Sequence, residues 1–218
     1  APFIPHSSRF PHNFSLFLMC GIAGLFRPQV AVTTEDVLAV RRMLQAQRHR
    51  GPDGEGLAVP DTGFSPYGIR QQEQQGFFAC PSSHIVLGHP RFAIIDRSEA
   101  GQQPMCNEDG TIWITYNGEI YNFLALRAEL KRRGHTFRSQ TDTEVIVHGY
   151  EEWGIDGVLS RLHGMFAFAL YDTRLRAEGE HTTGGQLILA RDRLGIKPLY
   201  YARLASEEGT IFASEVKA

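Results

Sequence analysis

The chain has 218 residues, of which 42% are hydrophobic and 21% are charged, and its 22 Lys and Arg stand against 24 Asp and Glu for a formal net charge of −2. This is the composition of an ordinary globular protein with one sizeable core. The near-neutral balance argues against nucleic acid or an acidic membrane as the main partner. The longest apolar run, residues 16–26, is too short to cross a bilayer, so we expect no nucleic-acid binding and no membrane insertion.

The first 19 residues are expected to form an extension outside the fold. They hold three Pro, four Phe, one Arg and no acidic residue, and their apolar stretch ends in bulky Met19. A signal peptide or a lipidated Cys20 needs a small residue before the cleavage point, so both interpretations are disfavoured. The three cysteines Cys20, Cys80 and Cys106 form no CxxC pair, which indicates a reducing, cytoplasmic location.

Three amphipathic helices are expected along the chain. Thr33 and Asp36 resemble a capping box, which predicts a helix over residues 34–47. The apolar spacing after residue 122 predicts a second helix that ends at Gly134. Thr141 and Glu144 form another capping-box pattern and predict a third helix.

Short segments rich in β-branched and aromatic residues predict strands between these helices. They are residues 21–26, 85–87, 92–95, 111–116, 165–171, 187–190, 199–202 and 210–213. Residues 60–83 and 174–185 read as surface loops because Gly, Pro and polar residues dominate them. Strands do not alternate regularly with long helices, so the pattern indicates an α+β fold with largely antiparallel sheets.

Several common site motifs are missing from the chain. There is no GxxxxGK[ST] phosphate loop, no HExxH and no GxSxG. The nine histidines are scattered without zinc-like spacing, so no metal site is expected.

Compact polar clusters remain, and each has a structural explanation when taken singly. Cys20 fits a small buried hydrophobe, and Asn117 with Gly118 fits a hairpin turn. Asp142 fits the start of a helix, and Arg91 fits a charge on a surface strand.

Taken together and in order, the clusters resemble the glutaminase domain of the asparagine synthetase family, a class II glutamine amidotransferase of the N-terminal-nucleophile hydrolase superfamily. The matching segments are Cys-Gly-Ile-Ala-Gly at 20–24, Arg-His-Arg-Gly-Pro-Asp at 48–53, Asn-Gly-Glu-Ile-Tyr-Asn at 117–122, Asp-Thr-Glu-Val-Ile at 142–146, Gly-Met-Phe-Ala-Phe-Ala at 164–169, Arg-Asp-Arg-Leu-Gly-Ile-Lys-Pro-Leu-Tyr-Tyr at 191–201 and Phe-Ala-Ser-Glu-Val-Lys-Ala at 212–218. The resemblance implies one amidotransferase domain over residues 20–218, folded as a four-layer αββα sandwich.

The resemblance also implies a mechanism in which Cys20 is the nucleophile. A thiol and the α-amine of the same residue have similar pKa values, near 8.5 and 8, so a chain-terminal Cys carries its own base. Cys20 would then have to become the first residue, either because Met19 is the initiator or because the extension is processed. Asn117 and Gly118 would stabilise the oxyanion, with the turn geometry aiming the Gly118 N–H.

A free glutamine substrate brings an α-carboxylate and an α-ammonium that need partners in the pocket. By resemblance, Arg91 would hold the carboxylate and Asp142 the ammonium. The same pocket would be lined by Phe92, Ala93, Ile94, Ile95, Asn117, Gly118 and Glu119.

In the family, a C-terminal synthetase domain uses the ammonia to make asparagine from aspartate and ATP. No SGGxDS-type nucleotide loop occurs here, so no cofactor is expected in this chain, and ATP and Mg²⁺ are expected only in a synthetase domain in cis or in trans. Three alternatives stay open: ammonia supply to another carboxylate, a relative of other amidotransferases, and a non-catalytic glutamine-binding module. The resemblance also leaves a homodimer open.

Overall fold

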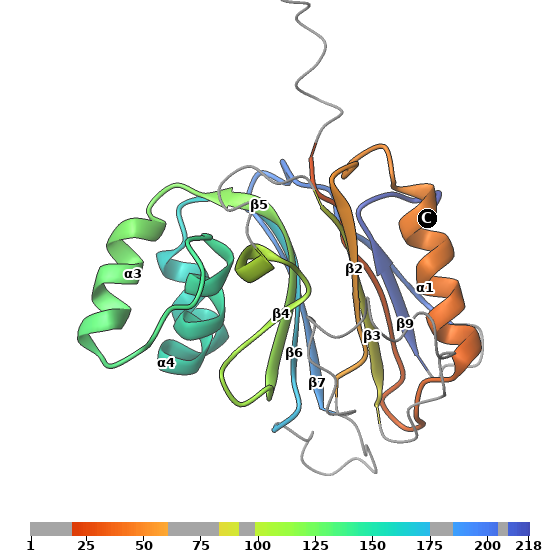
Figure 1. Ribbon diagram of the computed structural model, residues 1–218, viewed down its shortest axis with the longest axis horizontal. Coiled ribbons are helices and arrows are strands. Elements are labelled where there is room, and N and C mark those ends of the chain that lie inside the picture. Colours follow the sequence, from red (N-terminus) through yellow and green to blue (C-terminus); the bar gives the residue numbers. More distant parts are fainter. Residues whose placement is uncertain (1–18, 61–82, 92–98, 175–184, 205–208) are drawn as a thin grey trace, which may run out of the picture.

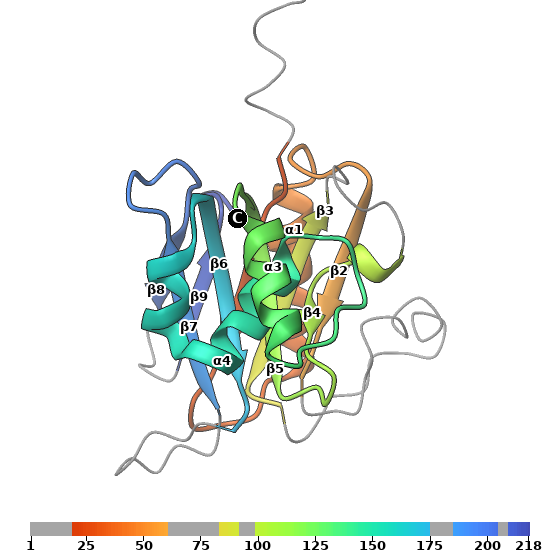
Figure 2. The same ribbon diagram turned by 90° about the vertical axis from the view of Figure 1, so that its left-hand side faces the viewer.

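The computed structural model describes residues 19–60, 83–91, 99–174, 185–204 and 209–218. Two antiparallel sheets lie face to face, and helices cover the outer face of each (Figure 1). The view turned by 90° shows α3 and α4 lying across the strands of their sheet (Figure 2). The expected α+β fold with four αββα layers is therefore confirmed.

The first sheet has the strand order β2-β3-β1-β9-β8, and all its pairs are antiparallel. Its strands are β1 (Ala23–Phe26), β2 (Gly54–Ala58), β3 (Ile85–Arg91), β8 (Tyr200–Arg203) and β9 (Thr210–Ala213). The earliest strand, β1, occupies the centre between β3 and β9, so segments far apart in the sequence meet there.

The second sheet has the order β4-β5-β6-β7 and is also antiparallel. Its strands are β4 (Met105–Cys106), β5 (Ile112–Ile120), β6 (Gly164–Asp172) and β7 (Gln186–Arg191), and a 3₁₀ turn, η1 (Glu99–Gly101), precedes β4. Since β4 is only two residues long, most of the outer edge of β5 extends beyond it.

The helices are α1 (Thr34–Ala46), α3 (Phe123–Arg132) and α4 (Thr143–Arg161). The predicted capping box of α1 is confirmed, because Thr33 Oγ1 accepts from Asp36 N and Thr33 N donates to Asp36 Oδ2. Gly134 ends α3 with a φ of 102°, as expected. Gly154, with a φ of 67°, divides α4.

The capping box expected at Thr141 and Glu144 is wrong. The Glu144 carboxylate instead accepts hydrogen bonds from the backbone N–H of Arg138 (2.7 Å) and Ser139 (2.9 Å) in the preceding loop. Cys106 lies in strand β4.

The core has an apolar layer on each side of both sheets. One layer packs α3 and α4 against the second sheet, another packs α1 against the first, and a third fills the space between the sheets. The third layer includes Ile22, Trp113 and Phe212. Over the described residues, no helix combines the length and apolar character that crossing a membrane requires.

Candidate active site

Cys20 lies three positions before the first residue of β1, at the same end of the first sheet as Arg91. The Gly21 N–H donates to the Pro90 carbonyl oxygen over 3.1 Å. The strand register pairs Ala23 with Gly88, so its continuation places Cys20 opposite Arg91. Both residues are half-buried.

The segment carrying Cys20 is held from two further directions. Arg50 Nε donates to the Cys20 carbonyl oxygen over 3.2 Å, and Arg50 Nη1 lies 3.0 Å from Glu215 Oε1. On the other side, the Ile22 N–H donates to Ser214 Oγ over 3.0 Å. The Arg-Gly-Pro-Asp loop and the C-terminal segment therefore both fix the backbone of the proposed nucleophile.

Asn117 faces the space between the two sheets from the middle of β5. Thr115, two positions earlier on the same face, donates its hydroxyl to the Gly88 carbonyl of the opposite sheet over 3.0 Å. Asn117 is 1% exposed, and its Nδ2 is buried without a hydrogen-bond partner among the described residues. A buried amide donor left unpaired is costly, so this N–H₂ is available to a ligand.

The expectation that a turn aims the Gly118 N–H is wrong, since Gly118 is inside β5 and pairs with Phe166. Asp192 lies on the side of β6 that faces away from β5. Its Oδ2 accepts from the Phe166 N–H, and its own N–H donates to the Phe166 carbonyl oxygen. In an antiparallel pair, two opposed residues either bond to each other through their backbone groups or both point these groups outward. The Phe166 backbone groups point outward, to Asp192, so the Gly118 N–H also points outward, away from β6.

The same outer edge of β5 carries the N–H groups of residues 116 and 120. Tyr116 N donates to Gln103 Oε1 over 2.7 Å, and Ile120 N donates to Asp142 Oδ2 over 2.9 Å. The Gly118 N–H therefore lies between these two occupied donors, on the edge that extends beyond β4.

Asp142 is the N-cap residue of α4, yet its side chain makes no capping hydrogen bond. It accepts instead from the Tyr116 hydroxyl (2.6 Å) and from Ile120 N. Burial raises the pKa of the Asp142 carboxyl, with a further contribution from Glu119, while these hydrogen bonds oppose the rise. Asp142 thus lies at the start of a helix, as expected, but its carboxylate is anchored at the edge of the second sheet and does not cap the helix.

Electrostatic interactions connect these groups to Cys20. Burial and Asp142 raise the pKa of Tyr116 well above 10, and the negative charge of Cys20 adds to the rise. The Tyr116 hydroxyl therefore stays protonated and donates to Asp142, within electrostatic range of the thiol.

Lys197 is a neighbour of Cys20 that the sequence did not identify. It is 4% exposed, and its Nζ lies 3.2 Å from Met19 Sδ. Asp192 folds the preceding loop by accepting from the N–H groups of residues 194, 196 and 197. Burial lowers the pKa of the Lys197 ammonium, Arg50 adds to this effect, and Cys20 opposes it.

The structure thus brings Cys20, Asn117, Gly118, Asp142 and Arg91 to the two facing sheets. Glu119 follows Gly118 on β5 and is exposed. The remaining predicted pocket residues, Phe92, Ala93, Ile94 and Ile95, lie outside the described residues.

His89, also unassigned from the sequence, is buried between the sheets beside Thr115, with 3.3 Å between Nδ1 and Oγ1. Burial, helped by the positive charge of Arg91, lowers the pKa of His89 to about 3. The unfolded chain binds a proton at this residue below about pH 6.5, whereas the folded chain does not until about pH 3. His89 therefore makes stability fall as the pH drops through this window.

We expect His89 to lower the free energy of unfolding by about 1.4 kcal/mol for each pH unit below 6.5. Urea unfolding of the wild type and of His89→Asn, whose amide can still reach Thr115, should give a shallower pH slope for the variant. Identical slopes between pH 4 and 6.5 would contradict the assignment.

Comparison with known proteins agrees with this geometry. A family model described as a glutamine amidotransferase domain matches residues 69–218, a segment that begins after Cys20. Asparagine synthetase [glutamine-hydrolyzing] 1 of Bacillus subtilis is 36% identical over 92% of this chain and 26% of its own length. Asparagine synthetase [glutamine-hydrolyzing] 3 of Arabidopsis thaliana is 42% identical over 92% of this chain and 28% of its own length.

A solved glutamine phosphoribosylpyrophosphate amidotransferase of B. subtilis shares the fold, with a TM-score of 0.66 and 22% identity over 91% of this chain and 42% of that one. The chain spans about a quarter of the length of the curated relatives that it matches. Because the family model covers more than half of the sequence, the chain belongs to the glutamine amidotransferase domain family.

Proposed function

We propose that this domain hydrolyses L-glutamine to glutamate and ammonia through a thioester on Cys20. The observation that carries the proposal is the buried, unpaired Nδ2 of Asn117, next in sequence to the outward-facing N–H of Gly118. A side-chain amide without a hydrogen-bond partner among the described residues, next to an outward-facing backbone N–H, suits an oxyanion. Cys20 supplies the nucleophile.

In the proposed first step, the Cys20 sulfur attacks the side-chain carbonyl carbon of glutamine. The free α-amine of Cys20 takes the thiol proton, and the carbonyl oxygen becomes an oxyanion between Asn117 Nδ2 and Gly118 N–H. The protonated amine then gives its proton to the departing nitrogen, so that ammonia leaves and a thioester remains. Water attacks the thioester with the same amine as base, which releases glutamate and restores the thiol.

Specificity for the free amino acid would come from two charged groups. Arg91, at the end of β3 opposite Cys20, suits the α-carboxylate because a guanidinium can bind it in a bidentate manner. Asp142, anchored by Tyr116 and Ile120, suits the α-ammonium, and Glu119 adds negative charge nearby. Phe92, Ala93, Ile94 and Ile95 stay candidate pocket residues.

The test is ammonia release from glutamine by a chain that begins at Cys20, with Arg91→Lys as the specificity variant. We expect Arg91→Lys to raise the KM for glutamine about ten-fold to a hundred-fold with a smaller change in kcat, because a point charge replaces a bidentate donor. The wild type should discriminate strongly against glutamine within a peptide. Equal hydrolysis of peptide-bound glutamine would contradict the proposed clamp, and no ammonia release would favour a non-catalytic binding module.

We further propose that the ammonia serves asparagine synthesis from aspartate, since the curated relatives are named asparagine synthetases. ATP and Mg²⁺ would bind in a synthetase region, because no nucleotide loop is found in this sequence. Amidation of a different carboxylate is the alternative. Product analysis with aspartate, ATP and a synthetase partner distinguishes the two.

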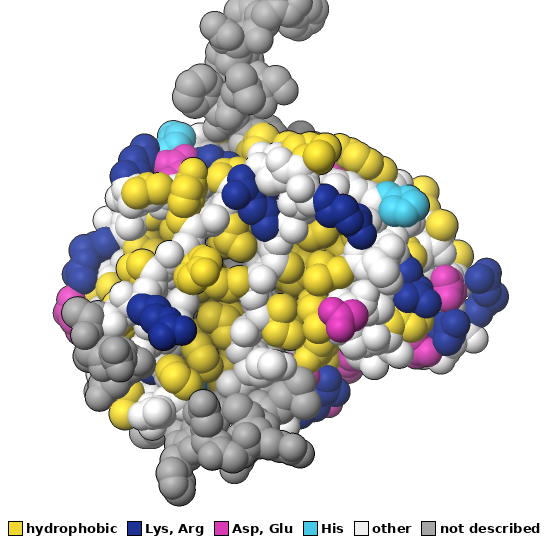
Figure 3. Space-filling model, turned by 180° about the vertical axis from the view of Figure 1, so that it is seen from behind, with side chains coloured by type: hydrophobic (Ala, Val, Ile, Leu, Met, Phe, Trp, Pro, Cys, Tyr) yellow, Lys and Arg dark blue, Asp and Glu magenta, His cyan; other side chains and the backbone are white. Residues whose placement is uncertain are grey.

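The surface offers a face for such a partner. Leu194, Ile196, Tyr200 and Tyr201 on and before edge strand β8 are exposed, as is Val216 near the end of the chain. Seen from behind, hydrophobic side chains extend over much of the molecule between scattered Lys and Arg (Figure 3). We propose that a synthetase region packs on this face in the cytoplasm. The alternative is a second copy of this chain, and the molar mass in solution would reveal such a homodimer.

A further inference from the structure

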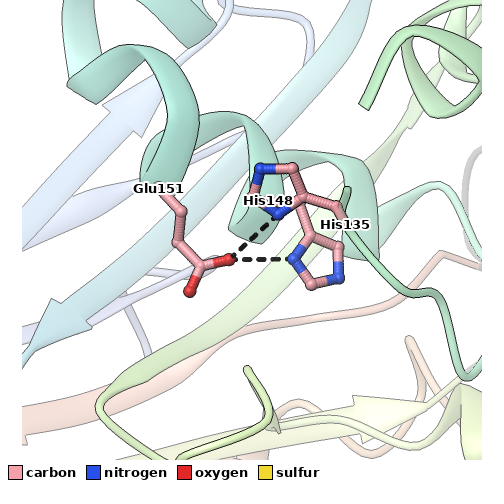
Figure 4. A group of neighbouring side chains, drawn as sticks. All are labelled: His135, His148 and Glu151. Atoms are coloured by element: carbon pink, nitrogen blue, oxygen red, sulfur yellow. Dashed lines mark hydrogen bonds and ion pairs between the residues drawn. The ribbon is translucent and has the colours of Figure 1, made fainter. Parts of the chain in front are cut away.

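Three potential metal ligands converge on the outer helical layer, away from the proposed active site. His148 and Glu151 belong to α4, and His135 directly follows the glycine that ends α3 (Figure 4). One ligand atom from each lies within 4.8 Å of the other two. This group was not predicted from the sequence, because the two histidines are thirteen positions apart and are brought together by the packing of α3 on α4.

The three side chains point their ligand atoms at one another. Glu151 Oε2 lies 2.8 Å from His148 Nδ1 and 3.7 Å from His135 Nδ1 (Figure 4). Zinc binds nitrogen and oxygen at roughly 2.0–2.2 Å, so tetrahedral ligands lie about 3.4 Å apart. The two observed separations bracket this value, and a shift of about 0.6 Å or less would bring each of them to it. The two imidazole nitrogens lie within 4.8 Å of each other. The longer separation exceeds hydrogen-bond distance, so the His135–Glu151 pair is not already closed by a direct hydrogen bond.

The atoms that face away from this centre are oriented by other side chains. His135 Nε2 lies 3.2 Å from Glu152 Oε2, and Glu151 Oε1 accepts from Asn107 Nδ2 over 2.8 Å. Metal-bound histidines are commonly oriented by a carboxylate on their second nitrogen. The hydrogen bonds of His135 and Glu151 therefore resemble those that orient the ligands of a metal site.

The second nitrogen of His148 also faces carboxylates, but at longer distances than that of His135. Its side chain is 2% exposed, and its Nε2 is buried without a hydrogen-bond partner among the described residues. This nitrogen lies 3.7 Å from Glu144 Oε1 and 3.8 Å from Glu108 Oε1. An N–H directed at these two carboxylates would leave Nδ1 as the metal ligand.

The charge of the cluster favours a cation. Four carboxylates, those of Glu108, Glu144, Glu151 and Glu152, surround the two histidines. Arg133 pairs with Glu152 at 2.8 Å and with Glu129 at 3.2 Å, so of the four carboxylates it offsets Glu152. Arg174 also acts electrostatically on Glu151, although its guanidinium is paired with Asp172 at 2.9 Å. A proton on the imidazoles is the competing occupant.

We propose that His135, His148 and Glu151 bind one zinc ion, with water completing the coordination. The ion would connect the loop after α3 to the first turns of α4. Glu144 already fixes the later part of that loop through Arg138 and Ser139, immediately before Asp142. The site is accordingly structural, and it would stabilise the segment that presents Asp142.

The experiment uses untagged protein with all three cysteines replaced by serine, so that thiols do not contribute ligands. After treatment with a chelator and gel filtration, zinc sulfate is added, and both bound zinc and thermal unfolding are measured. We expect one zinc per chain and a rise in Tm of about 5–10 °C at a hundred-fold excess over Kd. His135→Asn and Glu151→Gln should lose both effects, whereas His163→Asn, at an exposed histidine outside the cluster, should keep both.

Two results would overturn the proposal. The first is zinc uptake below one-tenth of an ion per chain with an unchanged Tm. This result would mean that protonated histidines paired with the glutamates hold the cluster together without a metal. The second is uptake that His135→Asn and Glu151→Gln do not reduce relative to His163→Asn. Since metal content and Tm are read without glutamine, neither result depends on glutaminase activity.

Discussion

Asn117→Ala should lower the kcat of glutamine hydrolysis by about 10²–10³ while leaving glutamine affinity largely unchanged. The Asn117 Nδ2 is buried without a hydrogen-bond partner in the part of the chain that the structure describes, so we expect its hydrogen-bonding capacity to be directed at a ligand. A donor that strengthens its bond as the carbonyl oxygen gains charge acts chiefly on the transition state, and the loss of one such donor has this magnitude. Steady-state ammonia release gives kcat, and calorimetry in a Cys20→Ala background gives the binding constant.

The matched control is Asn122→Ala. Asn122 lies two residues after the end of β5, and its side chain bonds to Arg161 O at 2.9 Å and to His163 N at 3.0 Å. Its removal should lower stability and leave kcat within about two-fold of the wild type. If Asn117→Ala retained wild-type turnover, Asn117 would have no part in the oxyanion site.

A chain that begins at Cys20 should hydrolyse glutamine about 10²–10⁴ times faster than one with an uncleaved residue before it. The α-amine of Cys20 is the proposed base, and a peptide bond to Met19 abolishes its basicity; positioned proton transfer contributes an effect of this size. A cleavable fusion that releases Cys20 as the first residue can be compared with the same fusion leaving one extra glycine.

Intact mass must verify both termini, and the rate of Cys20 alkylation must show that the thiol is accessible in each. Equal turnover of the two forms would rule out the terminal amine as base. The glycine-extended form should still bind glutamine, because Arg91 and Asp142 are unchanged.

Local sequence signals predicted those elements that depend on nearby residues. Thr33 and Asp36 bond to each other across one helical turn, and Gly134 adopts the left-handed conformation that its position demands. Both need little tertiary context. The strands at 165–171 and 210–213 were also found, because their apolar runs are buried whichever neighbour they pair with.

Signals that depend on distant partners were misread or missed. Asn117 and Gly118 resemble a turn, but pairing with β6 along nine residues keeps them extended. Strand β2 contains Gly54 and Gly56 and has low intrinsic strand preference, so only its pairing with β3 defines it. Glu144 resembles a capping residue, but the loop before α4 supplies competing N–H donors.

The candidate site was predicted from the sequence only by resemblance, because its residues come from separate strands and loops. Single motifs at Cys20, Asn117 and Asp142 each had an ordinary structural explanation. Arg50 and Lys197 lie in segments that match the family, but their contacts with the Cys20 segment were not predicted, since these contacts arise when Glu215 and Asp192 fold their loops.

The central position of β1 has a consequence for how the domain becomes competent. This strand is synthesised first, yet one of its two neighbours is β9, near the end of the described chain. Ser214 and Glu215, which follow β9, also fix the backbone on either side of Cys20, Glu215 through Arg50. The backbone around Cys20 therefore takes its final arrangement only after β9 and the residues that follow it have joined the sheet, and we expect this late, long-range pairing to be a slow stage of folding.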